Sequence, residues 1–271
     1  MANTSLNQDR IDLDLVNDYR EKYVVFLDLL GFRELVRKIG QDVLERHRVV
    51  EALKLVRDTL GQDPAIGLRF THFSDCIVIS TDHTAHALWE IFRSVELLTL
   101  NLLQYDIFVR GGLSVGPAHH SKDFVFGEAV TEAYDLEHKE ADGPRVLLSR
   151  KVADDAMKLG SDFAQWLKED GKARYFVNYL LRYAEYTPEL EVGKVVLESP
   201  AKRIVYFVTQ RLSNDKNDAL KKAQWFQAYW NDTVASRDVL PRIETGAILT
   251  KFEDGPTIMR RRLVAPIAVR R

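Results

Sequence analysis

Apolar residues along the chain follow two different periods, and their succession predicts a protein in which strands alternate with helices. Short apolar or alternating runs, typical of buried strands, occupy residues 23–30, 68–74, 77–79, 106–116 and 145–149. Apolar residues at helical spacing occupy residues 32–39, 42–60, 84–104, 128–140 and 151–159. The order contains a βαββαβ unit, which predicts an α+β, ferredoxin-like fold with helices on one face of an antiparallel sheet.

The pattern continues with fewer elements beyond residue 160. Apolar runs predict strands at 175–177 and 204–208, and helical spacing predicts a helix over 219–233. Four aromatic side chains of this helix are expected to pack in a core or a dimer interface: Trp225, Phe226, Tyr229 and Trp230. No repeat or linker sets this half apart, so we expect it to complete the first domain.

Polar segments between the predicted strands indicate turns. Ser74 and Asp75 separate two β-rich runs, which predicts a tight hairpin there. A second turn is expected over Pro117–Asp123, before another short apolar run. That placement would leave His119 and His120 exposed to solvent.

Composition excludes several classes of function. The 271 residues include 38 Lys and Arg against 40 Asp and Glu, a formal charge of −2, so no general nucleic-acid binding is expected. No apolar run approaches the ~20 residues of a membrane span, and residues 1–10 lack the features of a signal peptide. The single cysteine, Cys76, fits a reducing compartment and is expected to be a small strand residue. We therefore expect a cytoplasmic protein with neither a nucleic-acid nor a membrane partner.

Two aspartates stand where strands end. Asp28 closes an otherwise apolar run, and Asp75 lies in the predicted hairpin. Burying a lone carboxylate is costly unless it is paired or binds a metal, and in a βαββαβ sheet the first strand neighbours the hairpin. Together with the carbonyl of Leu29, the two carboxylates would make an oxygen-only site for Mg²⁺ or Mn²⁺. The alternative is two ordinary carboxylates at strand ends.

Four segments carry a family resemblance. The sequence FLDLLGF (26–32) resembles the first metal motif of the class III nucleotidyl cyclases, and FSDCIV (73–78) resembles the second. VRGGLSVG (109–116) and FGEAVTEAYDLE (126–137) are similar to the strand and helix motifs that follow in that family. The resemblance implies a palm-type core, two metal ions held by Asp28, Asp75 and the Leu29 carbonyl, and a head-to-tail homodimer with active sites between protomers.

The resemblance also suggests how the chain is divided. It covers about residues 23–150. We expect an N-terminal tail over 1–20, a cyclase core over 21–155, and over 156–271 a C-terminal elaboration that contributes to the dimer interface.

The chain departs from the family where positive charge is needed. The helix positions that hold an Asn and an Arg in ordinary class III cyclases are Thr131 and Asp135 here. Arg110 is one candidate to replace that charge. Lys202 and Arg203 are others, because they precede a run (204–208) that resembles the family's strand with a phosphate-binding Lys. The alternatives are a structural Arg110 that braces the sheet and solvated basic residues at 202 and 203.

The positions that read a purine in the family are Thr71 and Phe124 here. Neither supplies charge-assisted hydrogen bonds to a purine edge. In this the chain resembles the bacterial Pycsar pyrimidine cyclases, which make cyclic UMP or cyclic CMP in antiphage defence and signal to a separate effector protein. By that resemblance Phe26 would stack on the base or ribose; otherwise it is a core aromatic.

The favoured hypothesis is a cyclase that converts UTP to 3′,5′-cyclic UMP and pyrophosphate. The sequence does not separate UTP from CTP. A purine cyclase and a catalytically degenerate, nucleotide-binding regulator remain as further alternatives. A diguanylate cyclase is disfavoured because the hairpin reads Phe-Ser-Asp-Cys and contains no GGDEF-type motif.

Overall fold

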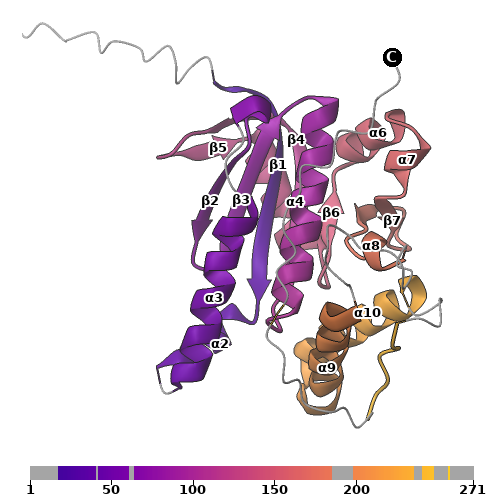
Figure 1. Ribbon diagram of the computed structural model, residues 1–271. Coiled ribbons are helices and arrows are strands. Elements are labelled where there is room, and N and C mark those ends of the chain that lie inside the picture. Colours follow the sequence, from indigo (N-terminus) through magenta and orange to yellow (C-terminus); the bar gives the residue numbers. More distant parts are fainter. Residues whose placement is uncertain are drawn as a thin grey trace, which may run out of the picture.

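A computed structural model describes residues 18–40, 42–60, 64–184, 198–234, 240–246 and 256. Its centre is an eight-stranded sheet with strands in the order β2-β3-β1-β4-β6-β8-β7, and β5 pairs with β4 (Figure 1). The strands are β1 (Arg20–Leu30), β2 (Arg69–Phe73), β3 (Cys76–Asp82), β4 (Phe108–His120), β5 (Val125–Gly127), β6 (Val146–Leu148), β7 (Leu167–Glu169) and β8 (Tyr175–Val177).

The helices confirm the predicted α+β class. They are α2 (Phe32–Ile39), α3 (Val43–Leu60), η1 (Pro64–Ile66), α4 (Ala85–Leu103), α5 (Glu128–Asp135), the π-helical η2 (Leu136–Glu140), α6 (Arg150–Lys158), α7 (Ser161–Ala164), α8 (Leu181–Ala184), α9 (Glu198–Asn214) and α10 (Asn217–Thr233). The first four core strands lie in the order β2-β3-β1-β4 with antiparallel neighbours, as a βαββαβ unit requires. None of the helices described is both long and apolar enough to cross a membrane.

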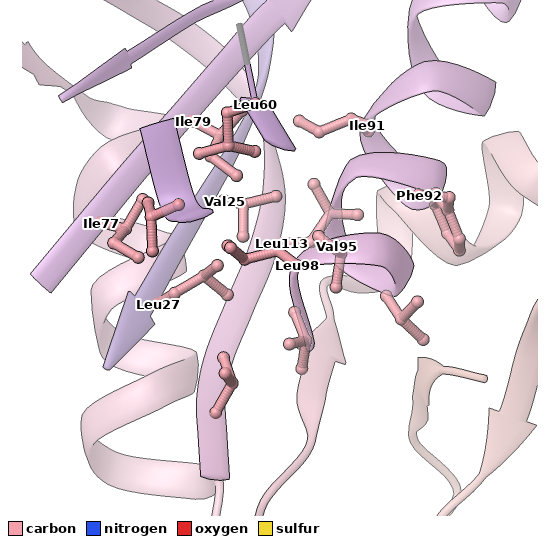
Figure 2. Close-up of a cluster of buried hydrophobic side chains, with 14 of the residues drawn as sticks. Val25, Leu27, Leu60, Ile77, Ile79, Ile91, Phe92, Val95, Leu98 and Leu113 are labelled. Carbon is pink, nitrogen blue, oxygen red and sulfur yellow. The ribbon is translucent and has the colours of Figure 1, made fainter. Parts of the chain in front are cut away.

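Successive side chains of β1 point to opposite faces of the sheet, and the two faces have different surroundings. Its odd-numbered residues, from Tyr23 to Leu29, enter the largest core, which α3 and α4 cover. Figure 2 shows part of this core, with sheet residues against residues of α4: Val25, Leu27, Leu113, Ile91, Val95 and Leu98. The even-numbered residues face the other side. Asp28 therefore lies on the face opposite to α3 and α4.

Two details of the expected architecture are wrong. The sheet is mixed, because β4 pairs with β6 in parallel. In addition, α5 covers the face opposite to α4, where Ala129 and Ala133 pack on Val24, Val78 and Ala118. Both differences have one cause: a parallel strand pair needs a crossover connection, and α5 with η2 supplies it between β4 and β6.

The strand predicted over 204–208 is also wrong, since these residues belong to α9. Its buried positions recur at helical spacing and enter a second core: Ala201, Ile204, Val205, Val208 and Leu212. The run of β-branched residues concealed this period. The helix predicted over 219–233 is confirmed as α10, and three of its four aromatic side chains are buried in the same core. The strands β6, β8 and β7 extend the main sheet toward these helices, while the division at residue 155 stays a prediction.

The turn expected over Pro117–Asp123 begins later than predicted. β4 runs on to His120 and pairs with β5, so the turn covers Ser121–Phe124. His119 and His120 are 2% and 1% exposed, not solvated as expected. His120 bonds to the hydroxyls of Thr71 and Ser80, and burial lowers its pKa to about 4, so the imidazole is neutral at pH 7.

One glycine of β4 permits the close approach of η2. A Cβ added at Gly112 would lie well inside van der Waals contact with the Ala133 carbonyl and the Leu136 side chain. We expect Gly112→Ala to lower the free energy of unfolding by about 1–3 kcal/mol through overpacking, measured by urea denaturation. The matched control is Gly116→Ala, whose added Cβ would meet Ala129 at an ordinary 3.7 Å. Equal stability of the two variants would contradict this account.

Candidate active site

The structure brings Asp28 and Asp75 together at one edge of the sheet. In the β1–β3 pairing Asp28 lies opposite Cys76, the residue that follows Asp75. The amide of Leu29 donates a 2.9 Å hydrogen bond to the Asp75 carbonyl, which ties the hairpin turn to the end of β1. Ser74 makes the tight turn possible with a left-handed backbone (φ 57°). The local sequence thus puts each carboxylate at the end of a strand, and the pairing of β1 with β3 makes the two carboxylates neighbours.

Arg110 lies on β4, directly opposite Asp28 on the neighbouring strand β1. The two residues are paired in the β1–β4 register, and Arg110 Nη2 is 3.4 Å from Asp28 Oδ2. The same guanidinium forms an ion pair with Glu137, whose side chain is 3% exposed. Arg110 therefore bridges two carboxylates.

Glu137 was not among the predicted site residues. It is the last residue of the fourth motif and lies in η2, next to the buried Leu136. Glu137 occupies a helix position that faces the sheet, beside the buried Leu136. A carboxylate at such an inward position is the signal that could have identified it. Its ion pair with Arg110 makes it part of the site.

Crowded negative charge marks this edge of the sheet. The pKa of Asp28 is raised to about 6, first by burial and then by the carboxylates of Glu137 and Asp75, while Arg110 and, more weakly, Lys222 lower it. Burial, together with the same three carboxylates, also raises the pKa of the Cys76 thiol to about 11. Cys76 is consequently protonated at neutral pH and unsuited to act as a nucleophile.

The donor set fits a hard divalent cation. Asp28 and Asp75 offer carboxylate oxygens, and the Leu29 carbonyl lies on the hairpin side of β1, because the N–H and C=O of one strand residue point the same way. Oxygen-only ligands suit Mg²⁺ or Mn²⁺, and a cation would relieve the repulsion that raises the pKa of Asp28. Among the described residues, no group of three or more His, Cys, Asp and Glu side chains is placed to hold a metal. Two carboxylates and a carbonyl are therefore the set that this edge offers.

The predicted substrate-binding residues are spread over the molecule. Phe26 is half-buried on the same face as Asp28, with its ring edge-on to Tyr134 at 5.3 Å. Thr71 bonds to His120 at 2.9 Å, and Phe124 is 59% exposed in the turn before β5. Lys202 lies in the first turns of α9, so the strand that was expected to present it does not exist. Of these predicted substrate-binding residues, Phe26 is the one that shares a strand and a face with Asp28.

The two departures in the helix motif have local partners. The Thr131 hydroxyl donates to the Gly127 carbonyl at 3.2 Å. Asp135 pairs with Lys139 one turn later, at 2.9 Å. Neither side chain brings positive charge to the aspartates.

The negative charge around Asp28 predicts that the stability difference between the wild type and Asp28→Asn depends on pH. Because the folded pKa of Asp28 is about 6 against an ordinary 3.8, the folded protein binds more protons than the unfolded chain between these values. Stability therefore falls as pH rises through that window. Without divalent metal, Asp28→Asn should raise the free energy of unfolding at pH 7 by about 2–3 kcal/mol, with no gain below about pH 4.

Urea denaturation in EDTA at both pH values measures this difference, with Asp123→Asn in the exposed turn as control. Adding Mn²⁺ should then stabilise the wild type and leave Asp28→Asn unchanged. A gain from Asp28→Asn that is the same at both pH values would contradict the assignment.

Comparison with known proteins gives structural matches at low sequence identity. No protein-family model matches the sequence, and no curated protein matches it significantly. Among solved structures, the chain is similar to the monomeric guanylyl cyclase domain of the RhoGC fusion protein from the aquatic fungus Blastocladiella emersonii. The identity is 14% and the TM-score 0.41, covering 59% of this chain and 95% of that one.

Two further structures match at a similar level. One is a class III adenylyl cyclase-like ATP-binding protein from Pseudomonas aeruginosa, with 18% identity and a TM-score of 0.38, covering 53% of this chain and 37% of that one. The other is an adenylate/guanylate cyclase/hydrolase from Silicibacter pomeroyi, with 18% identity and a TM-score of 0.35, covering 58% and 94%. At this distance the matches place no individual residue of the site.

Proposed function

We propose that the protein is a nucleotidyl cyclase that converts UTP to 3′,5′-cyclic UMP and pyrophosphate. The observation that carries the proposal is the pair Asp28 and Asp75, held at one sheet edge by the hydrogen bond from Leu29 to the Asp75 carbonyl. Two carboxylates and a carbonyl at that spacing suit divalent cations that bind a triphosphate. The four segments that resemble cyclase motifs lie at the end of β1, in the hairpin between β2 and β3, in β4, and in the run from β5 to η2.

In the proposed reaction the ribose 3′-oxygen attacks the α-phosphorus. The bond from that oxygen to phosphorus forms, the bond to the β-phosphate oxygen breaks, pyrophosphate leaves, and the 3′-hydroxyl proton passes to solvent. Bound divalent ions would neutralise the phosphate charge and make the 3′-hydroxyl more acidic. Asp28, Asp75 and the Leu29 carbonyl would hold these ions, and Arg110 keeps Asp28 and Glu137 in place.

Preference for a pyrimidine is proposed from the residues at the two positions that read a purine in the cyclase family. Thr71 is an uncharged hydroxyl bonded to a neutral His120, and Phe124 carries no polar group. Such a pair does not provide the charged contacts that select a purine edge. Phe26, beside Tyr134, offers an aromatic surface for base or ribose. A head-to-tail homodimer, an effector protein that senses the product, and a role in antiphage defence complete the proposal.

The test is to incubate the protein with Mn²⁺ and UTP, CTP, ATP or GTP one at a time and to measure product mass. We expect cyclic UMP together with an equal amount of pyrophosphate. Cyclic CMP as the main product would identify the cytidylate alternative, and a cyclic purine nucleotide would overturn the pyrimidine preference. Nucleotide binding without any cyclic product would favour the degenerate regulator.

A further inference from the structure

A cavity lies where the C-terminal helices meet the end of β1. Its volume is about 400 Å³, and its wall includes Leu30 and Gly31, which directly follow the metal-site residues. The start of β4, the helices α2 and α3, the end of α9 and the start of α10 close the remaining sides. In Figure 1, α9 and α10 lie beyond the end of the sheet where β1 stops. The C-terminal elaboration thus forms part of the wall of a cavity that reaches Leu30, two residues after Asp28.

Two of the three basic side chains in this wall are paired to carboxylates. Arg211 contacts Asp106 at 2.5 Å and Asp215 at 3.4 Å. Arg48 contacts Glu45 at 3.2 Å and Asp106 at 3.4 Å, and it also donates to the Tyr105 carbonyl. Their charge is compensated within the protein. They are poorly suited to bind an added anion.

Lys222 is the third basic residue in the wall. It lies one turn after Ala219 on α10, and both line the cavity, so this ridge of the helix faces it. Its side chain is partly buried, and in the part of the chain that the structure describes it makes no ion pair or hydrogen bond.

Arg110, the basic residue beside Asp28, is already engaged, because it pairs with both Asp28 and Glu137. A triphosphate brings several negative charges to an edge that already holds three carboxylates. We propose that Lys222 binds the terminal phosphates of the nucleotide and the pyrophosphate that leaves, so that α10 supplies a substrate-binding side chain. This inference rests on the proposed function for the identity of the nucleotide. Its chemistry, binding of a metal-complexed pyrophosphate group beside Asp28, can be measured without turnover.

The experiment is calorimetric titration of the full chain with inorganic pyrophosphate in the presence of Mn²⁺. We expect the wild type to bind, Lys222→Ala to bind about tenfold more weakly, as the loss of one charged contact predicts, and Lys222→Arg to keep most of the affinity. The matched control is Lys221→Ala, whose exposed side chain pairs with Asp218 at 3.2 Å and should leave the affinity unchanged. Thermal unfolding of each variant checks the fold.

The outcomes separate this inference from the proposed function. No binding by the wild type, or equal affinity in Lys222→Ala and the wild type, would overturn the role of Lys222, whatever the nucleotide assays show. Tenfold weaker binding in Lys222→Ala alone would support it, even if no nucleoside triphosphate is cyclised. In that last case the proposed function fails and the pyrophosphate site stands.

Discussion

Replacing Asp75 by alanine is expected to lower the rate of the proposed UTP cyclisation by about a thousandfold, or about 4 kcal/mol of transition-state stabilisation. Asp75 lies in the turn that the Leu29 amide ties to β1, and its side chain is one of two carboxylates at that edge. Without it, one of the two proposed metal-binding carboxylates would remain. The rate is measured as cyclic nucleotide formed at saturating Mn²⁺.

The fold of Asp75→Ala should be intact. The side chain is partly exposed, and the hydrogen bond to Leu29 uses the backbone carbonyl, which the substitution keeps. Asp123→Ala, in the exposed turn before β5, removes a carboxylate of the same kind away from the site and should keep full activity. Near-normal turnover of Asp75→Ala with Mn²⁺ would show that the assignment of the metal site is wrong.

Replacing Arg110 by alanine is expected to lower the free energy of unfolding by about 3–5 kcal/mol. Arg110 is the ion-pair partner of Glu137, whose side chain is 3% exposed. Removal of the guanidinium would leave a buried carboxylate uncompensated, with Asp28 nearby. Urea denaturation at pH 7 measures the loss.

A double variant separates the ion pair from the packing of Arg110. Arg110→Met combined with Glu137→Leu removes both charges and should recover much of the stability lost in Arg110→Ala. Lys139→Ala breaks the exposed pair with Asp135 and should cost less than about 1 kcal/mol. A loss in Arg110→Ala as small as that in Lys139→Ala would contradict a buried, stabilising ion pair.

Much of the core could be predicted from local pattern because strand and helix periods differ clearly there. The apolar run before Asp28 is β1, and the polar pair before Cys76 is the hairpin turn. The prediction failed where one pattern fits two structures. The run 204–208 is rich in β-branched residues, yet it is helical because its apolar positions also match the stripe that packs on the second core.

The histidines of β4 show a second way in which the sequence-based prediction failed: the partner strand could not be foreseen from local pattern. Pro117 suggested a turn, but the strand continues to His120 because β5 supplies backbone partners. Pairing with a later segment decided the burial of His119 and His120, and no local pattern carries that information.

The sequence by itself determined the candidate residues of the site: two aspartates at strand ends, a strand of small residues, and a set of oxygen donors of the kind that hard cations prefer. Only the tertiary structure decided the charge balance around them. Arg110 meets Glu137 because the crossover after β4 returns η2 to the sheet, and Lys222 reaches the cavity because α10 packs beyond β1. The physical reason is that ion pairing acts over a few ångströms, while these partners lie far apart along the chain and are brought together only by packing.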